Sequence, residues 1–229
     1  MTDFLLDIFN KIGFSVCHQI PERTISFGTK SMPVCSRCMG IYIGFMFSII
    51  IMLIIFRKKE SGFPPVYIII SSIIFIISAG IDGLFSYMGI YETNNIIRIT
   101  TGYLSGMGIS VICYPVFAFQ YYKNPKNRQI FDSARHFTVL LFAASIFILT
   151  AILKPAFLGN FYYFLNISAI IFTFTFSNLL IVLFIPCFSK KSERLFSAYL
   201  VLSVVIGIIL SFLEIYLLWL FHMFLIRKF

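Results

Sequence analysis

Three cysteines and a histidine lie close together near the start of the chain. Cys17 and His18 are adjacent, and a short polar stretch separates them from a Cys35-x-x-Cys38 pair. Thiolates and imidazoles bind zinc, and thiols also exchange electrons through disulfides. These four residues are therefore the candidates for metal or redox chemistry in this chain.

A zinc site would use Cys35 and Cys38 as one chelating pair and Cys17 with His18 as the other. This set supplies three sulfurs and one nitrogen, which suits tetrahedral zinc. Two ligands of a pair are commonly separated by about two to four residues, whereas Cys17 and His18 are adjacent. One alternative is that only one of these two binds, which leaves an open position on the metal.

The segment between the two ligand pairs has the pattern of a hairpin. Arg23–Phe27 and Ser31–Val34 flank the turn-forming residues Gly28-Thr29-Lys30. A hairpin brings its two ends together, so it would bring the two ligand pairs together as well.

A redox interpretation makes Cys35 and Cys38 a dithiol that cycles with a disulfide, resolved by Cys17 and coupled to a membrane quinone. Arg37 and the N-terminus of the following helix would both lower a thiol pKa. No strand and helix alternation of the thioredoxin kind surrounds the motif. A third interpretation is a static disulfide or structural metal that holds the N-terminal segment in place.

Composition identifies the class of protein that must position these residues. Hydrophobic residues make up 59% and charged residues 12% of the 229 residues, and the mean hydropathy is +0.95. This composition excludes a soluble domain and predicts an all-α, polytopic helical membrane protein. The net charge of +9 is spread over short clusters between apolar runs, so it indicates membrane topology and contact with lipid, and no nucleic-acid partner.

Six apolar runs are each near the length of about 20 residues that a spanning helix needs. They cover residues 39–56, 65–90, 97–121, 136–153, 161–186 and 197–226. The stretch Phe4–Val16 is shorter and carries Asp7 and Lys11, so we expect an amphipathic helix on the membrane surface. No cleavable signal sequence is evident before the cysteines.

The runs divide one membrane-embedded domain into three parts. Residues 1–38 form the N-terminal interfacial helix and the Cys/His segment, residues 39–121 form a three-span core, and residues 122–229 form three further spans. Basic residues gather in the connections after the first, third and fifth spans, which favours a cytoplasmic location for these loops. We therefore expect the Cys/His segment to be extracytoplasmic in a multi-pass cell-membrane protein, although this segment carries four basic residues of its own.

Polar residues near the ends of the spans are a second set of candidates. With a rise of about 1.5 Å per residue from Pro65, Asp82 lies roughly 25 Å along its span, near the outer edge of the hydrocarbon. Charges at this depth are usually paired or functional, and Arg98 is the expected partner. These polar residues either cap helix ends at the water boundary or form a polar pocket that faces the cysteines; they are Asp82, Asn94, Asn95 and Arg98. Glu214 lies at a similar level in the last span and is either a functional acid or a partnered one.

Two glycine pairs favour close packing of the first and third spans. Gly40-x-x-x-Gly44 opens the first and Gly102-x-x-x-Gly106 opens the third. Small residues at this spacing let helix backbones approach closely. Such packing would hold the cysteine pair beside the polar pocket.

Together these motifs resemble those of a family of predicted membrane proteins called domain of unknown function 2085. The resemblance extends from Cys17 to Pro115, about half of the chain. The residues that carry it are Cys17-His18-Gln19-x-Pro21-Glu22-Arg23, Pro33-x-Cys35-x-Arg37-Cys38-x-Gly40-x-Tyr42-x-Gly44, Asp82-Gly83, Asn95, Arg98, Gly102 and Gly106. The resemblance implies a compact multi-span core in which these positions act together, and it implies no particular reaction.

The leading hypothesis is a zinc-site membrane enzyme, a hydrolase or transferase, that acts on a lipid-linked or amphiphilic substrate at the outer face. The metal would polarise an oxygen or activate water, Asp82 would act as base and Arg98 would bind an anionic group. Asn95 and Glu214 are further catalytic candidates. One alternative is a thiol-disulfide oxidoreductase coupled to a quinone, and another is an ion-coupled transporter in which Asp82 and Glu214 mark the ion path.

Overall fold

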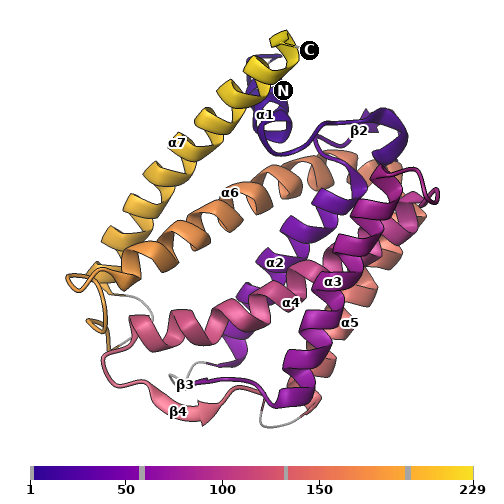
Figure 1. Ribbon diagram of the computed structural model, residues 1–229. Helices are drawn as coiled ribbons and strands as arrows, with labels where there is room; N and C mark the ends of the chain where they lie inside the picture. Colours follow the sequence, from indigo (N-terminus) through magenta and orange to yellow (C-terminus); the bar gives the residue numbers. More distant parts are fainter. Residues whose placement is uncertain (1–2, 57–59, 132–133, 194–196, 229) are drawn as a thin grey trace.

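The computed structural model describes residues 3–56, 60–131, 134–193 and 197–228. Most of these residues are helical, as Figure 1 shows, and the predicted all-α class is confirmed. The helices are α1 Asp3–Val16, α2 Ser36–Ile55, α3 Val66–Tyr87, α4 Asn95–Tyr121, α5 Ala134–Leu153, α6 Gly159–Phe184 and α7 Ala198–Lys228. The short elements are the 3-10 helices η1 Pro21–Arg23 and η2 Ala156–Leu158 and the strands β1 Ser26–Phe27, β2 Lys30–Ser31, β3 Glu60–Gly62 and β4 Lys126–Gln129.

Six helices of the described chain, α2 to α7, are long and apolar enough to cross a membrane. Their ends lie close to the ends of the six predicted runs, so the multi-pass architecture is confirmed. The predicted helix at Phe4–Val16 is α1, which packs against α7 and α6.

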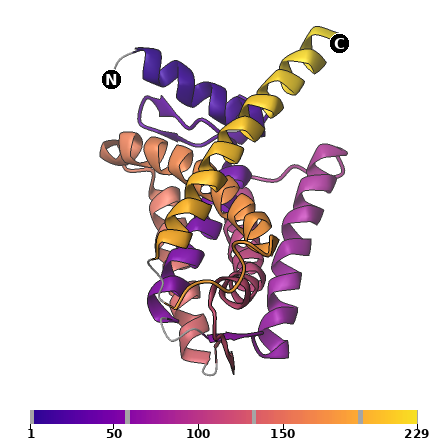
Figure 2. The same ribbon diagram turned by 90° about the vertical axis from the view of Figure 1, so that its left-hand side faces the viewer.

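The surface of α3 explains why the bundle requires a membrane. Figure 2 shows α3 at the edge of the bundle. Its buried residues follow a helical spacing along one face and are Ile68, Ser72, Ala79, Asp82 and Ser86. Its other faces expose large apolar side chains such as Ile74 and Leu84. Lipid solvates such a surface, while the helix satisfies its own backbone hydrogen bonds.

The centre of the bundle is the contact between α2 and α4. A Cβ atom at Gly40 would lie 2.6 Å from the carbonyl oxygen of Ile99, and one at Gly44 would lie 2.5 Å from that of Tyr103. Gly102 and Gly106 contact the backbone of α2 in the same way. The predicted close approach is confirmed, because these positions have no room for a side chain.

The three basic connections meet at one end of the bundle. In Figure 1, β3 and β4 lie side by side at this end, where they pair in parallel. The α6–α7 connection joins them through a bridge between Tyr122 and Ser192. The loops that are expected to share the cytoplasmic face therefore share one end of the structure.

The Cys/His segment lies at the opposite end. As predicted, a hairpin forms there, with β1 and β2 antiparallel around a turn of Gly28 and Thr29. Gly28 has a φ of 61°, a conformation that glycine adopts without strain. Lys30 in β2 donates a hydrogen bond to Asn160 in α6 over 2.7 Å, which joins the hairpin to the start of α6.

Candidate metal centre

Cys17 lies directly after α1, where the chain reverses direction. Gln19 turns the chain with a φ of 51°, and its amide nitrogen donates hydrogen bonds to the carbonyl oxygens of Asn10 at 3.2 Å and Pro33 at 2.8 Å. These bonds join the segment after α1 to the segment before α2. They bring the buried Cys17 to the first turn of α2.

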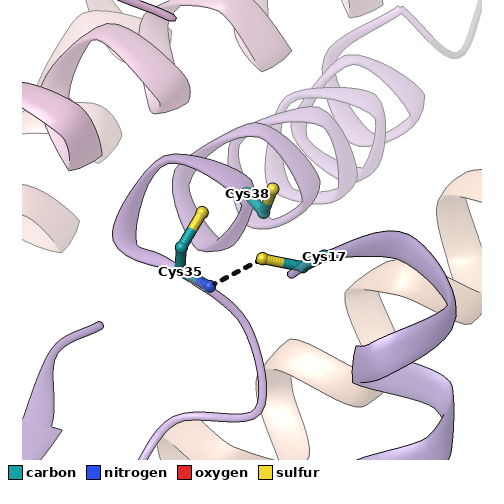
Figure 3. A group of neighbouring side chains, drawn as sticks. All are labelled: Cys17, Cys35 and Cys38. Atoms are coloured by element: carbon teal, nitrogen blue, oxygen red, sulfur yellow. Dashed lines mark hydrogen bonds between the residues drawn. The ribbon is translucent and has the colours of Figure 1, made fainter. Parts of the chain in front are cut away.

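Cys35 and Cys38 lie on the first turn of α2. Cys35 is the N-cap residue and Cys38 is three residues further on. Residues at this spacing lie on one helix face, so both thiols project to the same side. The backbone N–H of Cys35 donates a hydrogen bond to Sγ of Cys17 over 3.2 Å, as Figure 3 shows.

The three thiols converge from two segments of the chain (Figure 3). Their Sγ atoms all lie within 4.8 Å of one another, and all three cysteines are free. Thiolates that hold zinc at about 2.3 Å in tetrahedral geometry are about 3.8 Å apart, so this set could close on an ion by shortening its separations by ~1 Å. The arrangement has the donor type and the spacing of a zinc site.

Hydrogen bonding among the thiols favours a thiolate. Hydrogen bonds from Cys17 and then Cys38 hold the pKa of the Cys35 thiol well below its usual 9.0. The same pairing with Cys35 raises the pKa of Cys17. The thiolate is the form that binds metals, so Cys35 is the cysteine of the three that most readily acts as a metal ligand.

His18 does not belong to this group of three. Its exposed ring stands edge-on to His222 at the end of α7, with ring centroids 4.8 Å apart. The His222 ring in turn stacks on Phe14, and its Nδ1 lies 2.7 Å from the Phe14 carbonyl oxygen. His18 lines the same cavity of about 180 Å³ as the three cysteines. Its role as a fourth ligand stays a prediction.

This cavity, which we call the thiol cavity, is also lined by three arginines. They are Arg23, Arg37 and Arg98. A larger cavity of about 640 Å³, the outer cavity, shares Arg23 and Arg98 with it and extends along the α3–α4 connection. The two cavities therefore adjoin at Arg23 and Arg98, together with Ile20 and Tyr87.

Asp82 is paired with Arg37, so the predicted pairing with Arg98 is wrong. The side chain of Asp82 is 3% exposed. Arg37 Nε donates to Asp82 Oδ2 over 2.8 Å, Arg37 Nη2 donates to the same oxygen, and the Tyr91 hydroxyl donates to Oδ1 over 2.7 Å. Arg37 reaches this carboxylate from the first turn of α2 and forms a hydrogen-bonded ion pair with it.

Arg98 instead bonds to α3 one turn beyond Asp82. Its Nη2 donates to the Ser86 hydroxyl over 3.2 Å, and its Nε has no partner in the part of the chain that the structure describes. Asn95, on the same helix, donates from Nδ2 to the Glu22 carbonyl oxygen over 3.4 Å. Asn95 thus joins α4 to η1 and does not line the thiol cavity.

Glu214 lies at a separate place. The amide of Asn178 in α6 donates to its carboxylate over 2.8 Å. Glu214 lines a cavity of about 530 Å³ between α2, α6 and α7, and Asp82 does not line that cavity. The two acids that were expected to mark one ion path do not share this cavity.

Sequence reasoning did not identify Arg37 and Tyr91 as partners of Asp82. For Arg37 a signal exists, since it lies between Cys35 and Cys38 and must enter the site with them. Tyr91 lies in the connection between two spans, and nothing in its local sequence indicates a buried partner.

Known proteins match the part of the chain that contains the three cysteines. The profile of a family described as predicted membrane protein (DUF2085) matches residues 17–112. An uncharacterised protein of Methanothermobacter thermautotrophicus is 36% identical over 97 residues, which cover 42% of this chain and 83% of that protein. The chain belongs to this family. An uncharacterised protein of Methanocaldococcus jannaschii is 32% identical over 111 residues, or 48% of this chain and 69% of that protein. No solved structure matches.

The region that matches domain of unknown function 2085 contains the complete thiol and arginine cluster. It begins at Cys17 and ends within α4, so it also includes Arg37, Asp82 and Arg98. Glu214 and His222 lie outside it. Membership in a family of predicted membrane proteins agrees with the six candidate spans of the described chain.

Proposed function

We propose that this protein is a membrane metalloprotein that binds one zinc ion through Cys17, Cys35 and Cys38. The observation that supports the proposal is the convergence of three free thiols within 4.8 Å of one another. A disulfide uses two sulfurs and leaves the third unexplained. Three thiolates at this spacing match zinc, whose protein sites often hold several cysteines.

We further propose that the fourth position on the zinc is open to the thiol cavity. Among the described residues no histidine, aspartate or glutamate joins the group of three cysteines. Structural zinc sites usually have four protein ligands, whereas catalytic sites have three and a water or substrate in the fourth position. An enzyme, either a hydrolase or a transferase, is therefore the function that this donor set supports best.

The location of the site favours an amphiphilic or lipid-linked substrate. The thiols lie at one end of a bundle of spanning helices, opposite the basic connections. On the positive-inside rule this end is the extracytoplasmic one. A substrate held in the membrane by an apolar tail would present its polar head at this level.

The residues around the thiols would have separate roles in substrate binding and positioning. A bound zinc ion supplies a Lewis acid or an activated water. Arg98 and Arg23 would hold an anionic group of the substrate, since both line the thiol cavity. Both carboxylate oxygens of Asp82 already accept hydrogen bonds, so we assign Asp82 a positioning role through Arg37 in place of the expected role as base.

One observation favours a second candidate, a thiol oxidoreductase. Cys35 is the N-cap of α2, and its thiol pKa is lowered. In such an enzyme Cys35 and Cys38 would form a disulfide and pass two electrons and two protons to a quinone, which becomes a hydroquinone. This mechanism gives no direct role to Arg23 and Arg98, which line the cavity beside the thiols.

Metal analysis of the protein purified in detergent separates the two candidates. We expect about one zinc ion per wild-type chain, and loss of that zinc in Cys17→Ser, Cys35→Ser and Cys38→Ser. Cys187→Ser is the matched control, because Cys187 is exposed and lies in the α6–α7 connection, away from the thiols. Metal-free wild-type protein with a reducible Cys35–Cys38 bond would contradict the zinc proposal and favour the oxidoreductase.

A further inference from the structure

We infer that Arg98 and Arg23 form a binding site for a phosphoryl group beside the three thiols. This inference names the substrate class of the proposed zinc enzyme and rests on that proposal. Three observations support it. Arg98 is buried without a carboxylate partner in the described chain, both arginines line both cavities, and positive charges outnumber negative ones at the site.

Arg98 is a buried cation without a carboxylate partner in the described chain. Its side chain lies in a spanning helix and is only 6% exposed. Its Nη2 donates a hydrogen bond to the neutral Ser86 hydroxyl, and its Nε is buried without a partner among the described residues. An unpaired charge in such a place is strongly unfavourable, and Asp82, the nearby acid, already forms an ion pair with Arg37. An anion from outside the chain would satisfy Arg98.

The two cavities give an anion a route to Arg98. The outer cavity and the thiol cavity share Arg98 and Arg23. The carbonyl oxygen of Arg23 accepts a hydrogen bond from the Ser36 hydroxyl over 3.0 Å, which holds η1 against the start of α2. Arginine presents a planar fork of donors that matches phosphoryl oxygens. A phosphoryl group between the two arginines would therefore lie next to the thiols.

Charge balance favours an anionic ligand at the two arginines. Three arginines face one buried carboxylate, Asp82, and a zinc ion on three thiolates would add one negative charge. One positive charge then remains. A phosphodiester carries one negative charge, and a phosphomonoester carries about −1.5 to −2 at pH 7. Glu22 and Glu92 are exposed and line the outer cavity beside the two arginines, but among the described residues neither forms an ion pair with Arg23 or Arg98.

The outer cavity also borders the lipid-facing end of α3. It is lined by Tyr87, whose side chain is exposed, and by Ile20 of the Cys/His segment. A lipid headgroup could enter from this side, and a soluble phosphate ester could enter from the water. Both present the same phosphoryl oxygens to Arg98, so binding experiments must distinguish these two sources.

The test measures phosphoryl binding by calorimetry on the full chain in maltoside micelles, which contain no phosphate. One arm uses inorganic phosphate and glycerol phosphate, and the other uses micelles doped with phosphatidic acid. We expect binding in at least one arm, with Arg98→Met weakening it about tenfold to hundredfold through the lost charged hydrogen bonds. Lys154→Met is the matched control, because Lys154 is an exposed cation in the α5–α6 connection at the same end of the bundle, and it should bind like wild type.

The outcomes separate the two proposals because zinc is measured on the same samples. Zinc-loaded wild-type protein that binds in neither arm overturns the inference alone, as does Arg98→Met protein that binds like wild type. Zinc-free wild-type protein that binds phosphoryl groups through Arg98 contradicts the zinc proposal alone. If Arg98→Met does not fold, Arg23→Met, which lies outside the spans, must show the same loss.

Discussion

Arg37 donates hydrogen bonds from Nε and Nη2 to Oδ2 of Asp82, with Nε 2.8 Å from the oxygen, and so joins α2 to α3. A further bond of 3.1 Å runs from Nη2 to the Asp82 carbonyl oxygen. Arg37 lies between Cys35 and Cys38 in the sequence. The pair therefore fixes the helical turn that carries two of the three thiols.

Asp82→Asn tests this link, because it leaves the Arg37 cation without its charge partner. The Arg37 side chain is only 18% exposed, so we expect the free energy of unfolding to fall by about 3 kcal/mol, seen as a lower midpoint of thermal unfolding in detergent. Zinc retention should fall with it, since the turn of α2 loses its anchor.

The matched control for this substitution is Glu193→Gln. Glu193 pairs with Lys123 over 3.6 Å, and both side chains are more than half exposed. Such surface pairs contribute about 0–1 kcal/mol, so this variant should unfold near the wild-type midpoint and retain its zinc. Equal effects of the two substitutions would show that the Arg37–Asp82 pair has no special role.

Gly102→Ala should disturb the same turn from the side of α4. A Cβ atom at Gly102 would meet the carbonyl oxygen of Arg37 and lie 3.2 Å from its carbonyl carbon. Such overpacking typically costs about 1–3 kcal/mol. Because the displaced backbone is that of the cysteine turn, we expect a lower midpoint of unfolding and a lower zinc content together.

Gly80→Ala in α3 provides the comparison, because a Cβ atom there would meet nothing within 4 Å. Alanine is the better helix former by roughly 1 kcal/mol, so this variant should be as stable as wild type or more stable. Gly102→Ala protein with wild-type stability and zinc content would contradict the close contact between α2 and α4.

Tyr91 should titrate above its usual range. Its hydrogen bond to the Asp82 carboxylate raises the pKa of the phenol above the usual 10.0. Because the folded-state pKa is the higher one, the stability from this bond is complete below about pH 10 and is lost as the pH rises through the raised value.

The difference in tyrosinate absorbance between wild type and Tyr91→Phe isolates this one group during an alkaline titration. In an Asp82→Asn background, the midpoint of this difference titration should shift down toward the usual tyrosine pKa. If the wild-type titration has its midpoint at the usual tyrosine pKa, the hydrogen bond between Tyr91 and Asp82 does not form in solution.

Local patterns were sufficient to predict much of this architecture. The apolar runs predict the spans because a helix in lipid must bury its own backbone polar groups. Gly40 and Gly102 indicate the close contact of α2 and α4, since only small residues permit it. The hairpin follows from its turn residues, and it brings Cys17 to the cysteine pair as expected.

The partners of the charged residues depend on tertiary structure and were not predictable in this way. Arg98 and Arg37 are both basic residues near helix starts, and sequence distance to Asp82 favours Arg98. The rotation of α2 against α3 decides the pairing, and it directs Arg37 to the carboxylate. The contact of His18 with His222 likewise depends on where the end of α7 lies against the N-terminal segment.

X-ray absorption at the zinc edge can show whether three thiolates hold a zinc ion whose fourth position is open. We expect the same spectrum for wild type and for His18→Ala, with three sulfur neighbours at about 2.3 Å and one oxygen at about 2.0 Å. A wild-type spectrum with a nitrogen neighbour that disappears in His18→Ala would show a closed site and contradict the open position. Wild-type protein that binds no zinc would contradict the metal centre itself.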